Sequence, residues 1–332
     1  MENIWNIVDQ LEEAKKLISL GKTSSLRMAL LLLDNTAEIL MHREVMDLFF
    51  YEEFYKRLDK YAKTTLPDNA YKQWRQTEKI RFIETKRMQQ IDKSFDAKIK
   101  YLSENNDRIK KPLAKALNFI HRYRNEAYHR EHIRKEILRP IVILFFEFVC
   151  DLFVDLWSGS YSFKSTDNWH EYFVKYKISE DHSFQESDLE LISNKLKEGA
   201  IIDFQSLKTS LKTNLKNRFA DALENIKFLK GERIGSKINL PIDELKFIKN
   251  NNIIFEDRID KELKEIVQEF NFHDWVKRIN ELDIYVDKCS LFNVYASIEK
   301  EFEAIEYKIQ YLADKLDSWI QLQIDIDRVN KT

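Results

Sequence analysis

Glycine and proline are scarce in this chain, and their scarcity restricts the fold more than any other feature. The 332 residues include 5 Gly and 4 Pro. Folds built from many strands need both residues repeatedly at their turns, so an all-β or turn-rich fold is excluded. Apolar residues make up 44% and charged residues 33% of the chain, a balance typical of amphipathic helices and not of a disordered polymer. The composition therefore predicts an all-α, globular fold.

Apolar residues recur at three- and four-residue steps along most of the chain, which predicts helices. The first helix should stop at Gly21, and hydroxyls between Thr23 and Ser25 are good N-caps for the second. Pro112 suits the first turn of another helix. We expect helices over residues 3–20, 25–66, 68–93, 112–129, 141–157, 189–196, 204–229, from about 243 onward, and 290–329.

The length allows two domains of ordinary size. After Ser158-Gly159-Ser160 the helical pattern gives way to short aromatic and polar pieces. We therefore expect a first helical domain over residues 1–158, an aromatic-rich connector over 159–186 with a small strand pair as an option, and a second, mainly helical domain over 187–332. The second domain would serve regulation, recognition or dimerisation.

The cysteines and the N-terminus bear on the compartment. Cys150 and Cys289 have no metal-ligand spacing, so we expect no disulfide framework, no metal and no cofactor. Asp9, Glu12 and Glu13 interrupt the first apolar stretch, which a secretory signal would not tolerate. These features favour a cytoplasmic protein.

The most hydrophobic run, residues 141–157, is short for a membrane span and contains Glu147, Asp151 and Asp155 at four-residue steps. On a helix these acids form one polar stripe. The pattern indicates a core helix with one edge in solvent, with basic partners as the alternative, and no membrane contact.

One hexad, Arg124-Asn125-Glu126-Ala127-Tyr128-His129, combines residues that can cleave RNA without a metal. Such cleavage needs a group that takes the proton of the ribose 2′-OH and one that protonates the leaving 5′-oxygen, and histidine does both near neutral pH. The planar fork of Arg124 matches two phosphate oxygens, and Asn125 can orient the ribose, the phosphate or the imidazole. We take Arg124, Asn125 and His129 as the candidate catalytic residues.

Helical geometry constrains the hexad. On a regular helix Arg124 and His129 lie about 140° apart, so one straight helix cannot easily aim both at one phosphate. Either the helix ends or distorts within the hexad, or the site combines residues of two subunits. A two-fold dimer would provide both an acid and a base.

The hexad lies in the most basic part of the chain. From Arg108 to Arg139 there are ten basic against three acidic residues, a net charge of +7 in a chain of net charge -2. Such a surface suits a polyanion, although an ordinary charged helix is the alternative. The residues we expect to contact RNA are Lys111, Lys115, Arg122, Tyr128 and Arg130.

The R-N-x-x-x-H hexad resembles the motif of HEPN ribonucleases. The resemblance covers residues 1–158 and implies an antiparallel bundle of helices with catalytic Arg124 and His129. It also implies products with 2′,3′-cyclic phosphate and 5′-hydroxyl ends, a homodimer, and a role as a toxin or antiphage (abortive infection) effector controlled by a regulatory protein or a phage-derived activator. In HEPN toxins paired with nucleotidyltransferase antitoxins a tyrosine follows the histidine by two residues, where this chain has Glu131.

Several nearby residues allow two interpretations. Asp34, Glu38 and His42 form one helical stripe, which we interpret as a solvated edge, with a place behind the active site as the alternative. His121 and His132 flank the hexad and could bind phosphate or pack locally. For the whole first domain the alternative to a nuclease is an inactive HEPN-like scaffold that binds RNA or a protein partner.

Overall fold

The structure is a computed structural model that describes residues 4–78, 83–129, 135–157, 169–179, 184–229 and 272–330. These residues form twelve α-helices with a short π-helix and a short 3-10 helix, and they contain no strand, which confirms the all-α prediction. The described part of the expected connector is helix α8 (Trp169–Tyr176), not a strand pair. The helices expected between residues 243 and 271 lie outside the described residues.

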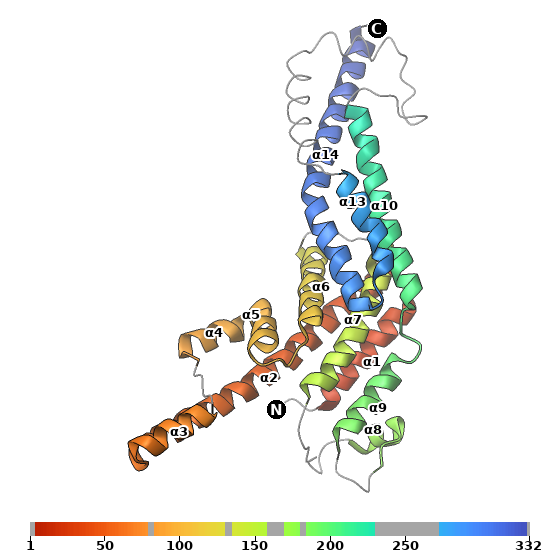
Figure 1. The fold of residues 1–332 in the computed structure, drawn as a ribbon. Coiled ribbons are helices and arrows are strands. Elements are labelled where there is room, and N and C mark those ends of the chain that lie inside the picture. Colours follow the sequence, from red (N-terminus) through yellow and green to blue (C-terminus); the bar gives the residue numbers. More distant parts are fainter. Residues whose placement is uncertain are drawn as a thin grey trace. The chain divides into compact units, whose positions relative to one another are not determined.

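Two compact units divide the chain, Met1–Asp203 and Phe204–Thr332 (Figure 1). The first continues past the boundary expected at residue 158 because α8 and α9 pack against its other helices. Tyr172 of α8 stacks on Trp5 at 4.4 Å, and Ser193 of α9 donates a hydrogen bond to the carbonyl of Cys150. Its helices are α1 (Ile4–Leu20), α2 (Thr23–Thr65), α3 (Asp68–Glu78), α4 (Thr85–Lys93), α5 (Phe95–Lys100), the π-helix Tyr101–Asn105, α6 (Lys111–His129), α7 (Lys135–Leu156), α8 and α9 (Glu186–Lys197).

The helix boundaries follow local sequence signals with three exceptions, the first of which is α7, because it begins at Lys135 and contains Pro140 whereas the sequence predicted a start after that proline. Gly21 adopts a positive φ of 66° after α1, as expected of a glycine at a helix C-terminus. The prediction that a hydroxyl between Thr23 and Ser25 caps the second helix is wrong, because Lys22 is the N-cap residue of α2 and its side chain forms no capping hydrogen bond. The expected helix over 68–93 is interrupted, with α3 ending at Glu78 and α4 beginning at Thr85.

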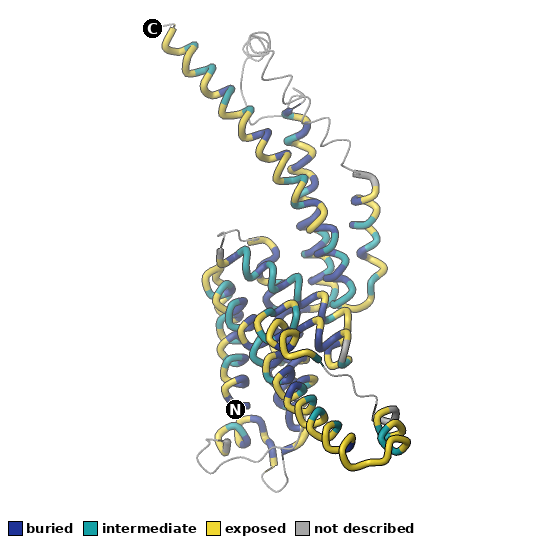
Figure 2. Tube along the Cα trace, turned by 90° about the vertical axis from the view of Figure 1, so that its left-hand side faces the viewer, coloured by how far each residue is buried: buried dark blue, intermediate teal, exposed yellow. Residues whose placement is uncertain are grey.

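The core of the first unit lies between α1, α2 and α7, where large apolar side chains are fully buried, among them Ile7, Leu11, Leu33, Phe145 and Phe153. Buried residues gather on the facing sides of the helices (Figure 2). None of the described helices combines the length and apolarity needed to cross a bilayer.

The acidic stripe of α7 has partners within the protein. Lys197 forms an ion pair with Asp151, and the backbone N–H of Ile202 donates a hydrogen bond to Glu147 at 2.9 Å. Burial raises the pKa of Asp155, as does the nearby Asp151. Asp151 and Asp155 are exposed, as the solvent interpretation of this stripe predicts, and Lys197 is for Asp151 the basic partner of the alternative. Glu147 is only half-buried and is satisfied by a backbone N–H of the segment after α9, a contact that the sequence pattern did not indicate.

The second unit contains α10 (Phe204–Leu229), α13 (Phe272–Glu281), the 3-10 helix Leu282–Ile284 and α14 (Lys288–Asn330). The helices expected over 204–229 and 290–329 are confirmed. Between α10 and α14 lies a buried polar network. Arg218 donates hydrogen bonds to Glu299 at 2.6 Å and to Glu306 at 2.5 Å, and the Tyr295 hydroxyl donates to Asn214 at 2.9 Å. Glu299 is completely buried.

Substituting Arg218 with alanine should strongly destabilise the second unit. The change leaves the Glu299 carboxylate buried without its cation, a loss worth about 3–5 kcal/mol. Denaturant unfolding of the full chain measures it. The matched control is Lys277→Ala, which removes a 3.8 Å ion pair with Glu281 at the surface and should change the unfolding free energy by less than about 0.5 kcal/mol. Equal effects of the two variants would contradict the role given to the network.

Candidate active site around the hexad

Helix α6 carries the whole hexad and ends at its last residue, His129. The helix is continuous from Arg124 to His129, so of the alternatives considered for the hexad a distortion is not found, and the helix ends only at the last residue of the hexad. The side chain of His129 lies outside the described residues. On this continuous helix Arg124 and His121 are three residues apart, which places them on the same face, about 60° from one another.

Asp34 of α2 joins these two side chains. Its carboxylate is 2% exposed, with Oδ1 2.9 Å from His121 Nδ1 and Oδ2 3.3 Å from Arg124 Nε. An ionised carboxylate is tolerated in such a place when cations or donors neutralise it. Asp34 therefore fixes the register of α6 on α2 and holds a histidine beside an arginine. The solvated-edge interpretation was wrong for this residue.

The guanidinium of Arg124 is only partly used by the protein. Its Nη1 donates a hydrogen bond to Asn125 Oδ1 at 2.9 Å, and its central carbon lies 5.6 Å from the ring centre of Tyr128. Within the described part of the chain, Nη2 has no hydrogen-bond partner. The side chain is 29% exposed, so these donors remain within reach of an incoming anion.

His121 is held in a defined orientation. Its ring stacks on Phe95 of α5 at 3.9 Å with an interplanar angle of 8°. Because an ionised carboxylate only accepts hydrogen bonds, the contact with Asp34 places a proton on Nδ1 and leaves the lone pair of neutral imidazole on Nε2. The side chain is 20% exposed. Sequence reasoning noted His121 but did not choose it, although its spacing from Arg124 was the available signal.

Arg27, near the start of α2, adds a cation that sequence reasoning missed. Its Nη2 donates a hydrogen bond of 2.7 Å to the carbonyl of Ala127, one of the last carbonyls of α6. Such carbonyls have no partner within the helix, and a cation also suits the negative end of the helix dipole. No local pattern indicates this contact, because one hundred residues separate its partners.

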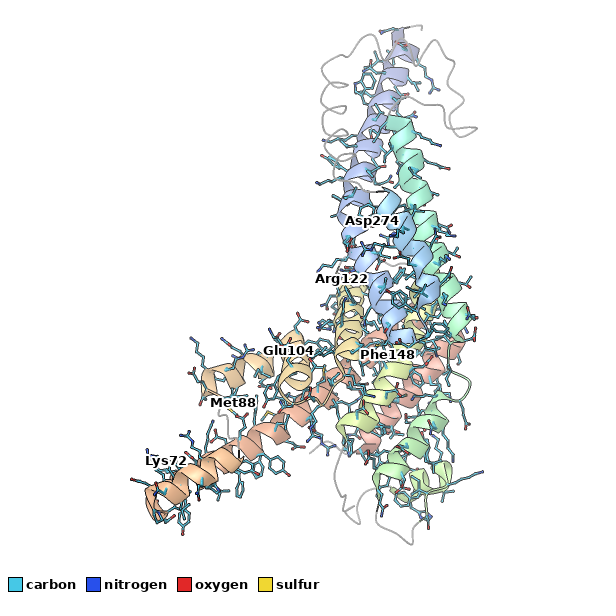
Figure 3. All side chains as sticks on the ribbon, in the orientation of Figure 1. Lys72, Met88, Glu104, Arg122, Phe148 and Asp274 are labelled. Carbon is cyan, nitrogen blue, oxygen red and sulfur yellow. The ribbon has the colours of Figure 1, made fainter. Side chains whose placement is uncertain are left out.

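The residues expected to bind RNA lie in different surroundings. Lys111 and Lys115 are exposed on α6, and Tyr128 is 59% exposed. Arg122, labelled in Figure 3, forms an ion pair of 3.3 Å with Glu126 and lies over the rings of Phe119 and Tyr123. Arg130 lies outside the described residues.

Acids of α2 offset part of the positive charge counted along residues 108–139. Glu44 lies 3.0 Å from Arg108, and Asp34 neutralises Arg124. Burial raises the pKa of Glu44, and the charge of Arg108 opposes this rise. The surface is therefore less basic than the linear count suggests, and the exposed cations that remain on α6 are Lys111 and Lys115.

The other two residues of the α2 stripe form separate contacts. Lys98, itself buried, lies 3.1 Å from Glu38, and His42 lies 2.9 Å from Asp92 at the surface. Among the described residues no group of three His, Cys, Asp or Glu side chains could hold a metal ion. Comparisons of the chain with protein-family models, curated proteins and solved structures find no match.

Substituting Asp34 with alanine should lower the free energy of unfolding by about 1.5–3 kcal/mol, because two charged or polar partners lose a buried acceptor. Urea denaturation of the full chain measures this change. Asp92→Ala is the control, since it removes the exposed partner of His42 and should cost less than about 1 kcal/mol. If the two variants unfold at the same urea concentration, Asp34 does not link α2 to α6.

Proposed function

We propose that this chain is an endoribonuclease that needs no metal ion and uses the 2′-hydroxyl of RNA as its nucleophile. The observation that carries the proposal is the arrangement around Asp34, which holds Arg124 beside His121 on one face of α6 and leaves donors of the arginine unused. The hexad itself supplies Asn125 and His129. No other group of described residues combines a cationic fork with an oriented imidazole.

In the proposed reaction, a neutral imidazole takes the proton of the 2′-hydroxyl, and the 2′-oxygen attacks the adjacent phosphorus. The bond to the 5′-oxygen breaks, and an imidazolium donates a proton to that oxygen. The products are a 2′,3′-cyclic phosphate and a 5′-hydroxyl. Arg124 neutralises the charge that accumulates on the phosphate oxygens, and Asn125, bonded to Arg124, holds the guanidinium plane.

Two histidines are available for the proton transfers. His129 is the residue that the HEPN resemblance implies, and His121 is the one that Asp34 orients with its Nε2 lone pair available. A site within one chain would use His121 together with Arg124. A site built across a homodimer would add His129 of a second copy, which the geometry of a continuous α6 favours over His129 of the same chain.

The cellular role follows from the activity. A ribonuclease without a cofactor suits a toxin or antiphage effector of the cytoplasm, held inactive until a regulatory protein or a phage-derived activator binds. The second unit, with its separate core of α10, α13 and α14, is the part we assign to that control.

A specific observation favours the alternative of an inactive scaffold. Asp34, Asn125 and Tyr128 all contact Arg124, as expected if the arginine were only a structural ion pair. In that case Arg124→Ala would lower the unfolding temperature by several degrees and no RNA cleavage would be found with the wild type, with or without candidate activators.

Wild-type protein, alone or with a candidate activator, should cleave labelled RNA in excess chelator, and Arg124→Ala should reduce that rate about 10²–10³-fold, as expected for loss of a donor to a transition-state oxyanion. Arg124→Lys keeps the charge but not the fork, so it should recover only part of the rate. Mass spectrometry of the products checks for cyclic phosphate ends. Cleavage that stops in chelator, or that gives 3′-hydroxyl ends, would contradict the proposal.

Substituting each histidine distinguishes the two forms of the site. If His121 transfers a proton, His121→Asn should lower kcat about 10²–10⁴-fold and remove one limb of the pH–rate profile. Asp34→Asn should then shift the same limb, which a purely structural role would not do. His42→Asn, a change at the surface of α2, is the matched control and should leave the rate unchanged.

Mixing inactive variants tests whether the active site is built from residues of two subunits. If Arg124→Ala and His129→Ala subunits recover activity when combined, each active site uses residues of two chains. If His129→Ala is inactive and mixing it with Arg124→Ala subunits does not recover activity, His129 acts in the same chain as Arg124. Full activity in His129→Ala would remove it from the mechanism and leave His121.

A further inference from the structure

The outer half of α2 carries an unusual group of exposed apolar side chains. All but one of the buried residues of α2 lie at or before Phe49, and Ala62 is the exception. Beyond that point most large apolar side chains of the helix are exposed (Figure 2). We define the aromatic stripe as Met46, Phe50, Tyr51, Phe54, Leu58 and Tyr61, whose exposed fractions range from 37% to 71%.

These residues lie along one side of the helix. Phe50, Phe54, Leu58 and Tyr61 follow each other at steps of four, four and three residues, the spacing by which helices pack against one another. The pattern therefore has the form of a helix-packing seam, although the described residues of this chain do not cover it.

The other side of the same helical segment is occupied. Glu52 accepts hydrogen bonds from the Tyr101 hydroxyl and from the backbone N–H of Ile83. Asp59 accepts a hydrogen bond from the Tyr71 hydroxyl of α3 at 3.0 Å. In Figure 3, where Lys72 marks α3 and Met88 marks α4, α4 lies above the outer part of α2, and the side chains along the lower edge of α2 have no helix beside them. The described elements of the unit thus occupy the opposite side of this segment and leave the stripe open.

Charges beside the stripe indicate what covers it. Asp47 and Glu53 lie in the inner part of this segment, and Arg57 and Lys60 in the outer part, all exposed. Glu53 forms an ion pair of 2.7 Å with Lys56 of its own chain, and the flanks of the stripe carry acids and cations alike, a mixture that does not favour the phosphates of RNA. If two copies of α2 pair antiparallel around Tyr55, however, Glu53 of each copy faces Arg57 of the other, because the two positions lie two residues before and two residues after that centre and on the same flank of the stripe.

We infer that two copies of this chain dimerise through the aromatic stripe of α2, in antiparallel orientation and with two-fold symmetry. Such an interface is self-complementary, as symmetric dimers require. If each of the six side chains on both copies buries roughly 100 Å², the interface covers about 1,200 Å², at the lower limit of stable protein interfaces.

This interface lies away from the hexad. At about 1.5 Å per residue, the centre of the stripe is about 30 Å along α2 from Asp34, so antiparallel pairing sets the two Asp34 residues about 60 Å apart along the helix pair. A dimer of this kind contains two separate clusters of Asp34, His121 and Arg124. The inference is therefore independent of an active site formed within one chain, and it excludes an active site shared across this same interface.

Sedimentation velocity of the full chain over the micromolar range tests the inference. Wild type should be dimeric, and Phe54→Glu should raise the dissociation constant about thirtyfold or more, as expected for a central aromatic of an interface. Val174→Glu replaces an apolar residue of α8 that is 65% exposed, against 50% for Phe54, and should leave the dimer intact. Circular dichroism checks that both variants are folded.

Charge reversal tests the antiparallel register. Glu53→Arg and Arg57→Glu should each weaken the dimer, and the double variant should restore it, since the repelling pairs become attracting ones again. A monomeric wild type, a dimer unaffected by Phe54→Glu, or a double variant weaker than both single variants would overturn the inference. So would loss of RNA binding by Phe54→Glu with the oligomeric state unchanged, which would assign the stripe to RNA.

Discussion

The first unit depends on the burial of one carboxylate. Asp34 lies on α2 with almost no exposure, and a charge in that position is tolerated only with partners close by. Arg124 and His121 provide them from adjacent turns of α6, so the register between α2 and α6 follows from this contact. Arg27 adds a second link by donating to a carbonyl near the end of α6. The position of the hexad is thus set by polar contacts as much as by apolar packing.

The same contacts would serve both the stability of the unit and the proposed chemistry, and distances alone do not distinguish the two roles. An ion pair that only neutralises a buried charge and one that orients a reacting group have the same geometry. What distinguishes this cluster is that it retains hydrogen-bonding groups without a partner among the residues that the structure describes. Nη2 of Arg124 and the Nε2 lone pair of His121 have no partner in the described residues, and both side chains are partly exposed. Unused donors and acceptors at a partly open site are what an incoming phosphate ester requires.

Helix α2 combines two different environments because it is about 65 Å long, longer than the helices that pack on it. Its inner half buries apolar residues together with Asp34, whereas its outer half leaves one side uncovered. A single rigid helix therefore connects the polar cluster to the aromatic stripe. The two regions are too far apart for contacts at one to form part of the other, so the proposed activity and the inferred dimer contact use separate parts of this helix.

The sequence by itself determined the helices, because their periodicity and end signals are local. The ends of α1, α10 and α14 and the break after Leu66 follow from apolar spacing and from glycine and proline. It also located the hexad, but not the residues that position it. Asp34 and His121 are 87 residues apart, and Arg27 and Ala127 are 100 apart. A stripe of acidic residues has the same spacing whether water or an arginine neutralises it, so only the packing of α2 on α6 decided that Asp34 is buried and that Arg124 and His121 meet there.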